Sequence, residues 1–136
     1  MPTESPSEFL LAAGKTFPWH ELYVPDIDAA KTFYTQALGF ETEEYPMGDG
    51  FVYHMLKKNG SGVAGMMSTA SGPAEGAPTH WAVYTAVDDV DQRVDKCVSM
   101  GAKVVVPAMD VPSVGRMCLI SDPQGAHIWL FTPVPM

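Results

Sequence analysis

Basic residues are scarce in this sequence. Its 136 residues include 8 Lys and Arg against 16 Asp and Glu, which gives a formal net charge of −8. A protein that binds DNA or RNA needs clustered Lys and Arg to neutralise phosphates, and here the few basic residues are scattered. The composition therefore excludes nucleic acid as a partner.

Cysteines and long apolar segments are also lacking. Only Cys97 and Cys118 are present, one in a helical and one in a strand pattern, so we expect buried reduced thiols and no disulfide framework. No apolar run approaches the ~18 residues of a membrane-spanning helix, and no basic region precedes the short apolar run near the N-terminus. We therefore expect a cytoplasmic protein with no membrane partner.

The sequence does contain one pattern that occurs twice. Residues 19–40 are typical of a strand, an Asp-containing turn and an amphipathic helix that ends at a glycine, and residues 80–104 repeat that order. Asp26 and Asp89, which can accept hydrogen bonds from the first helical N–H groups, lie 63 positions apart. A period of this size that fills most of the chain predicts two copies of one supersecondary unit.

Each copy has the order strand, helix, strand, strand, strand. In the first, Asp26 or Asp28 caps a helix that ends at Gly39; in the second, Asp88 or Asp89 caps a helix that ends at Gly101. Turn residues separate the remaining strands. The strands are predicted at 17–24, 41–45, 51–57, 62–69, 79–87, 103–106, 114–121 and 126–131. The predicted organisation is a flexible arm (1–16), a first module (17–69), a linker (70–78) and a second module (79–133).

The motifs VPDIDAAKTFYTQALGF (24–40), VDDVDQRV (87–94), GAKV (101–104) and DVPSVGRMCLISDPQGAHIWLF (110–131) resemble the vicinal oxygen chelate superfamily. This superfamily includes glyoxalase I, extradiol dioxygenases and bleomycin-resistance proteins. The resemblance covers about residues 17–133. It implies an α+β fold in which two tandem βαβββ modules form a cup-shaped mixed sheet, with the helices on its convex side and a cavity on its concave side.

The resemblance also implies where a metal would be held, on the first and last strands of each module. Carried over by position, the ligand positions are Trp19, Ala82 and Trp129, with Gly65 or Met66 as the fourth. A shift by one residue offers His20 as the only metal-binding side chain. Because these side chains cannot hold a hard cation, we expect the usual metal centre to be absent and no cofactor to be bound.

Strand alternation predicts what lines the cup instead. Most of the side chains predicted to line it are aromatic, and aromatic rings bind planar or cationic ligands by stacking. Methionines such as Met66 add pliable surface. Alternatively, Trp19 and Trp129 pack on each other and leave no cavity. Arg116 either holds its strand or meets a ligand carboxylate. The side chains predicted to point into the cup are those of Trp19, Glu21, Tyr23, Ala82, Tyr84, His127, Trp129 and Phe131.

Glu21 and His127 are the titratable groups among them. A carboxylate in an apolar cup is costly unless it is paired or protonated. If the two meet, they form either an acid–base couple or a silent ion pair, and we favour the silent pair because no nucleophile or oxyanion loop accompanies them.

Two functions follow from these residues. The favoured one is a metal-free module that binds an aromatic or apolar small molecule in the cleft between the two modules. The alternative is a lyase-like or dioxygenase-like enzyme that uses Glu21 and His127, either without metal or with one divalent metal that these two residues bind, with or without His54. The superfamily resemblance further favours a homodimer.

Overall fold

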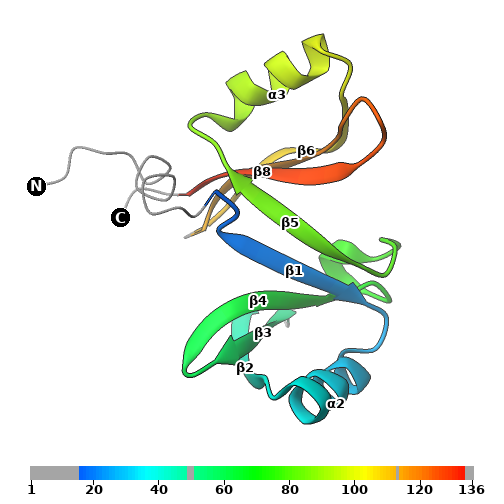
Figure 1. Cartoon of the computed structure of the whole chain (residues 1–136), viewed down its shortest axis with the longest axis vertical. Helices are drawn as coiled ribbons and strands as arrows, with labels where there is room; N and C mark the ends of the chain where they lie inside the picture. Colours follow the sequence, from blue (N-terminus) through cyan, green and yellow to red (C-terminus); the bar gives the residue numbers. More distant parts are fainter. Residues whose placement is uncertain (1–15, 49–50, 113, 134–136) are drawn as a thin grey trace, which may run out of the picture. The chain divides into compact units, whose positions relative to one another are not determined.

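The computed structural model describes residues 16–48, 51–112 and 114–133, so most of the predicted N-terminal arm lies outside the described residues. The chain divides into two compact units (Figure 1). The first unit is residues 19–82, and the second comprises residues 83–133 together with residues 16–18. Among the described residues, no helix is both long and apolar enough to cross a membrane.

The first unit is a mixed four-stranded sheet with one long helix. Its strands follow the order β2-β3-β4-β1; β1 is parallel to β4, and the other neighbours are antiparallel. Residues 70–78, the predicted linker, include a short 3-10 helix. The elements are β1 (Trp19–Val24), α2 (Ile27–Leu38), β2 (Glu41–Gly48), β3 (Phe51–Lys58), β4 (Ser61–Ser68) and η1 (Gly72–Ala74).

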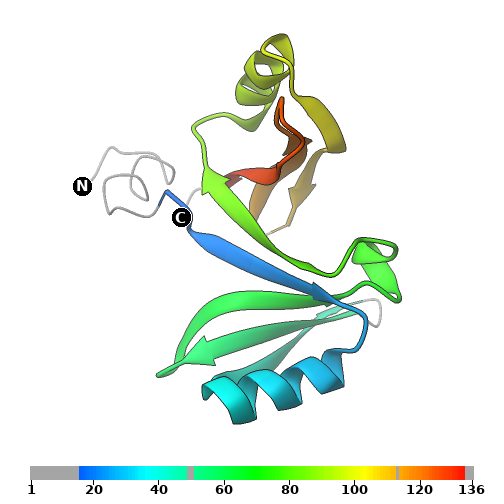
Figure 2. The same cartoon turned by 45° about the vertical axis from the view of Figure 1, so that its right-hand side comes forward.

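Helix α2 begins and ends where the sequence predicts. The Asp26 carboxylate accepts a hydrogen bond from the Ala29 backbone N–H at 3.0 Å, and Gly39 ends the helix with φ 76°, a conformation that favours glycine. The helix covers one face of the sheet (Figure 2). A buried apolar cluster fills the space between them and consists of Leu22, Ala30, Leu56, Ala64 and Met66.

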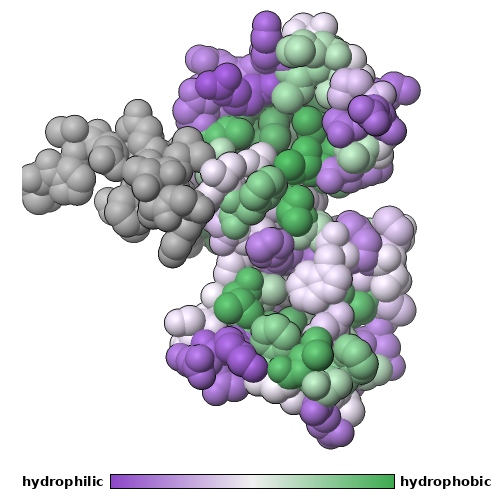
Figure 3. Space-filling view, viewed as in Figure 1, coloured by the Kyte–Doolittle hydropathy of each residue, from purple (hydrophilic) through white to green (hydrophobic). Residues whose placement is uncertain are grey.

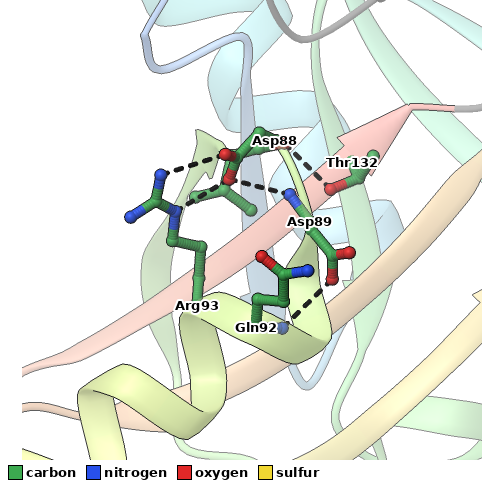
Figure 4. Close-up of polar contacts among 6 residues, drawn as sticks. Asp88, Asp89, Gln92, Arg93 and Thr132 are labelled. Atoms are coloured by element: carbon green, nitrogen blue, oxygen red, sulfur yellow. Dashed lines mark hydrogen bonds and ion pairs between the residues drawn. The ribbon is translucent and has the colours of Figure 1, made fainter.

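The second unit repeats this plan. Its strands follow the order β5-β8-β7-β6, with β5 parallel to β8. The Asp89 carboxylate accepts a hydrogen bond from the Gln92 N–H at 3.0 Å at the start of α3, and Asp88 pairs with Arg93 (Figure 4). A second apolar cluster, which includes Val90, Cys118 and Leu130, packs under this helix. The elements are β5 (His80–Ala86), whose residues 80–82 belong to the first unit, α3 (Val90–Ser99), β6 (Lys103–Val111), β7 (Gly115–Ser121) and β8 (His127–Pro133).

The predicted α+β fold of two βαβββ modules is confirmed, and strands β2 and β6 extend furthest beyond their predicted ends. Strand β2 continues past Pro46 to Gly48, and β6 continues past Pro107 to Val111. Each lies at the end of its unit's strand order, and in each the pairing register shifts beside the proline. Proline lacks a backbone N–H, which is tolerated at such irregular outer positions.

Candidate functional site

Strand β1 places Glu21 on the sheet face opposite α2. Its neighbour Leu22 points into the apolar cluster under the helix, so alternation turns Trp19, Glu21 and Tyr23 to the other side. Glu21 is only 3% exposed, and among the described residues it is the one charged or polar residue in the buried class. A buried carboxyl group of this kind requires partners.

Two polar side chains meet at Glu21. The Trp19 indole Nε1–H donates to Glu21 Oε2 at 2.9 Å, and the Tyr53 hydroxyl donates to the same oxygen at 2.8 Å. Trp19 Nε1 also lies 3.1 Å from the Tyr53 hydroxyl, which accepts from it. We call Trp19, Glu21 and Tyr53 the carboxyl triad.

A glycine on the intervening strand makes the triad possible. Gly65 on β4 lies in register with Glu21 on β1 and with Met55 on β3, between the strands that carry Glu21 and Tyr53. A Cβ atom at Gly65 would lie 2.6 Å from Glu21 Oε2 and would overlap the Tyr53 hydroxyl. The absence of a side chain there lets Tyr53 reach across β4 to Glu21.

Burial controls the protonation of the triad. Desolvation raises the pKa of Glu21 to about 7, although the hydrogen bonds from Tyr53 and Trp19 act in the opposite direction. Burial and the neighbouring Glu21 also raise the pKa of Tyr53, which stays a phenol. Near neutral pH, Glu21 therefore exists both as the acid and as the carboxylate.

Sequence reasoning missed Tyr53. The superfamily resemblance places ligands on the first and last strands of each module, whereas Tyr53 lies on the inner strand β3. Alternation in VYHMLK places Tyr53 and Met55 on one face, but the meeting with Glu21 depends on the register across β4. The available signal was Gly65, because a glycine inside a strand indicates a close approach of neighbouring atoms.

The aromatic residues predicted to line the cup fall into separate stacks. In the second unit, Tyr84 stacks on Trp129 with ring centroids 5.3 Å apart, and Phe131 lies edge-on to Tyr84. Trp129 is only 7% exposed, so most of its surface is already used in packing. In the first unit, Tyr23 stacks on His80 at 4.9 Å, and Ala82 is buried on the same strand as His80.

Met66 and Arg116, which were predicted to bind ligand, lie on the helix faces of the sheets. Met66 is buried in the cluster under α2. Arg116 pairs with Asp91 of α3 at 3.0 Å and with Asp110 at 3.2 Å. Because alternate residues of a strand point to opposite faces, Met66 does not lie on the sheet face that carries Glu21, and Arg116 faces the helix of its own unit.

The two histidines of the alternative function make none of the hydrogen bonds of the triad in the described part of the chain. His127 is exposed at the start of β8. His54 is half-buried on the helix face of β3, since its neighbour Tyr53 points to the opposite face, and its Nδ1 lies 3.9 Å from Glu44 Oε1. Desolvation, with a contribution from Lys31, lowers the pKa of His54.

The residues at the family's metal positions do not fit a divalent ion. Trp19, Ala82 and Trp129 carry no carboxylate or imidazole, and Glu21 Oε2 already accepts two hydrogen bonds. Within residues 16–48, 51–112 and 114–133, no group of three or more His, Cys, Asp or Glu side chains could hold a metal ion. We therefore derive no chemical step through a metal.

A shallow groove of about 360 Å³ lies on the helix face of the first unit, apart from the triad. His20 and Lys58 are its basic residues, and its walls include Trp81, which is 45% exposed. Apolar side chains are exposed on both units (Figure 3). Lys58 Nζ donates to the Gly39 carbonyl at 3.1 Å and lies 5.4 Å from the Phe40 ring centroid, so it also stabilises the end of α2.

The fold and the comparisons together define the class of protein. Residues 16–130 match the model of the Glyoxalase/Bleomycin resistance protein/Dioxygenase superfamily. The chain belongs to this superfamily, as its sequence motifs predict.

Two curated relatives are similar over most of the chain. The chain is 44% identical over 114 residues to "Putative glyoxylase CFP32" of Mycobacterium bovis, a match that covers 83% of the chain and 44% of that protein. It is 30% identical over 119 residues to the anthracycline biosynthesis protein DnrV of Streptomyces peucetius, a match that covers 79% of the chain and 43% of that protein. The chain thus spans less than half the length of these relatives.

A solved structure shares the fold. Methylmalonyl-CoA epimerase from Mycobacterium tuberculosis has a TM-score of 0.61 with 24% identity, and the match covers 89% of each chain. At this identity the likeness concerns the fold alone.

Proposed function

We propose that the chain binds a small aromatic or apolar molecule over the sheet face that carries Glu21, with the carboxyl triad as its polar anchor. The observation that carries the proposal is the 3% exposed Glu21 carboxyl, which is held by Trp19 and Tyr53 over a glycine. Binding sites combine a largely apolar wall with a few converging polar groups and a perturbed pKa, and the triad supplies the polar groups and the perturbed pKa.

The competing structural explanation is that the triad only stabilises the sheet. Buried polar networks are seldom needed for that purpose, because well-packed apolar residues of similar volume are often as stabilising or more so. A carboxyl group whose pKa is raised to about 7 by burial destabilises the ionised folded state near neutral pH. A role in ligand binding explains why such a group stands there.

A second candidate function is proton transfer, favoured by the same pKa. A carboxyl that titrates near neutral pH can act as a general base or acid at a carbon next to a carbonyl. Because His127 is exposed and Glu21 already has its own partners, this version assigns the proton to Glu21 alone. The names of the two relatives, a putative glyoxylase and an anthracycline biosynthesis protein, are compatible with either candidate.

Tryptophan fluorescence tests the binding proposal. Titration with the planar compound methyl naphthyl ketone should give saturable quenching that Trp19→Phe greatly reduces. Trp81→Phe is the matched control, because Trp81 lies on the helix face with its N–H bonded to the Tyr34 hydroxyl. The absence of saturable quenching, or quenching that survives Trp19→Phe unchanged, would contradict the proposal.

The same ketone tests proton transfer, since the hydrogens of its methyl group are acidic. In deuterium oxide, Glu21 would remove a methyl proton and return a deuteron, and proton NMR would record loss of the methyl signal. Exchange should exceed the buffer rate and fall to it in Glu21→Gln. Equal exchange in both proteins would leave binding as the function.

We retain a cytoplasmic homodimer as a prediction. Superfamily membership supports pairing, and sedimentation of the purified chain tests it. A single species at monomer mass would contradict it.

A further inference from the structure

The hydrogen bonds of the carboxyl triad are unevenly distributed over the two oxygens of Glu21. The Trp19 indole N–H can only donate, and it points to Oε2 and to the Tyr53 hydroxyl. Because that hydroxyl accepts from Trp19, its own hydrogen is directed to Oε2 at 2.8 Å. Within the described part of the chain, hydrogen bonds reach Glu21 only at Oε2.

This asymmetry determines which oxygen takes the proton when Glu21 is neutral. Oε2 faces two donors and therefore serves best as the carbonyl oxygen of the acid. The proton then lies on Oε1, where no acceptor from the described residues satisfies it. Among the described residues, His54 Nδ1 is the only fully buried side-chain nitrogen or oxygen without a partner, so Oε1 is not sealed off and an acceptor on a ligand can reach it.

We propose that Glu21 donates a hydrogen bond from Oε1 to a carbonyl oxygen of the ligand, and that the ligand class is a neutral aromatic ketone or a related carbonyl compound. The inference rests on the proposed binding function and specifies its chemistry. An anionic ligand is disfavoured by the chain's net charge of −8. A cationic ligand would instead select the ionised carboxylate.

Other titratable groups share this face of the first unit. The pKa of Glu21 responds to Tyr53 and Trp19, its hydrogen-bond partners, whereas Glu43 is paired with Lys57 at 2.6 Å near the outer strand. Strand β4 presents Gly65 towards Glu21. The titratable groups on this face are those of Tyr23 on β1, Glu41, Glu43 and Tyr45 on β2, Tyr53 and Lys57 on β3, and His80 on β5.

A donated proton links ligand affinity to pH. The ketone binds the protonated form, so its affinity should be constant below the pKa of Glu21, about 7, and fall about tenfold per pH unit above it. Glu21→Gln imitates the protonated acid, since its amide can turn its carbonyl to Trp19 and Tyr53 and its NH₂ to the ligand. This variant should bind the ketone with the low-pH affinity at every pH.

The experiment measures binding of methyl naphthyl ketone and of isopropylnaphthalene, a hydrocarbon of similar shape, between about pH 5 and about pH 9. The ketone should show the break near pH 7, whereas the hydrocarbon, which has no acceptor, should bind with no break. Glu21→Gln should remove the break for the ketone. Tyr53→Phe should move the break to higher pH, because the Tyr53 hydrogen bond lowers the pKa of Glu21; a purely structural Tyr53 would leave the break in place.

The outcomes separate this inference from the function on which it rests. If both compounds bind with the same pH profile, Glu21 does not donate a hydrogen bond to the ketone, and the proposed binding function is unaffected. If Glu21→Gln weakens ketone binding at low pH as much as Glu21→Ala does, the donor assignment is also wrong. If neither compound binds at any pH, the proposed function fails and this inference fails with it.

Discussion

The two units share a backbone plan but differ in what they bury on the sheet face opposite the helix. In the first unit, β1 contributes a carboxyl group held by an indole and a phenol. In the second, β5 contributes Tyr84, which stacks on Trp129 of β8. Glu21 and Tyr84 lie 63 positions apart, the same spacing as the helix caps Asp26 and Asp89. One repeat position thus holds an acid in one unit and an aromatic ring in the other.

What the units share indicates what the fold requires. Both helices begin at an aspartate that accepts a backbone N–H at 3.0 Å, and both pack on an apolar cluster. Among the described residues a buried carboxyl group is found in the first unit only, so a βαβββ module folds without one. The comparison supports the proposed function for Glu21, whereas the Tyr84–Trp129 stack is explained by packing.

The largest expected effect comes from breaking the aromatic stack. Trp129→Ala should lower the free energy of unfolding by about 3–5 kcal/mol, because it removes a large buried ring and leaves a cavity. Urea denaturation measures this, and Trp81→Ala serves as the control, since Trp81 is 45% exposed and should cost much less. A loss below about 1 kcal/mol for Trp129→Ala would show that the stack is available to a ligand and is not core.

The second prediction sharpens the contrast at Glu21. Its pKa is raised from 4.5 to about 7 in the folded protein, so the folded state binds a proton more tightly than the unfolded chain. The stabilisation from this proton is complete below about pH 4.5 and is lost as pH rises through about 7. Relative to Glu21→Gln, the native protein should therefore lose about 3 kcal/mol of stability over this range.

Denaturation at several pH values checks this second prediction, with the difference between the native protein and Glu21→Gln as the measured quantity. Taking the difference cancels groups that the two proteins share. A difference that does not change between about pH 4.5 and about pH 7 would contradict a raised pKa.

Much of the fold could be predicted from the sequence because its signals are local. Asp26, Gly39 and Asp89 define helix ends through contacts with residues a few positions away. The outer strands were predicted too short because Pro46 and Pro107 are tolerated only where the pairing register shifts, and that register is a property of the assembled sheet.

The candidate site was predicted in part for the same reason. Alternation along β1 was enough to turn Trp19 and Glu21 to one face, since their spacing is local. Tyr53 lies 32 residues from Glu21 in the chain and meets it only through the register of β3 and β4. Arg116 could not be assigned to a face because of the bend before β7, and its partner Asp91 belongs to the helix.

The smallest expected effect tests whether the glycine at the triad is required. Gly65→Ala should lower the free energy of unfolding by about 1–3 kcal/mol, since the new methyl group would displace a Tyr53 hydroxyl that is fixed by hydrogen bonds.

Gly62→Ala is the matched control on the same strand. Its Cβ would meet the Met55 Sδ atom, which lies near the end of a flexible side chain and can move away. Because Gly65→Ala separates Tyr53 from Glu21, it should also raise the pKa of Glu21, whereas Gly62→Ala should leave that pKa unchanged. Equal stability losses for the two variants, with no difference in the Glu21 titration, would mean that Gly65 serves the sheet and not the triad. A loss of stability confined to Gly65→Ala and accompanied by the shift in the pKa of Glu21 would show that the glycine in the first unit is required by the carboxyl triad, which the second unit lacks among its described residues.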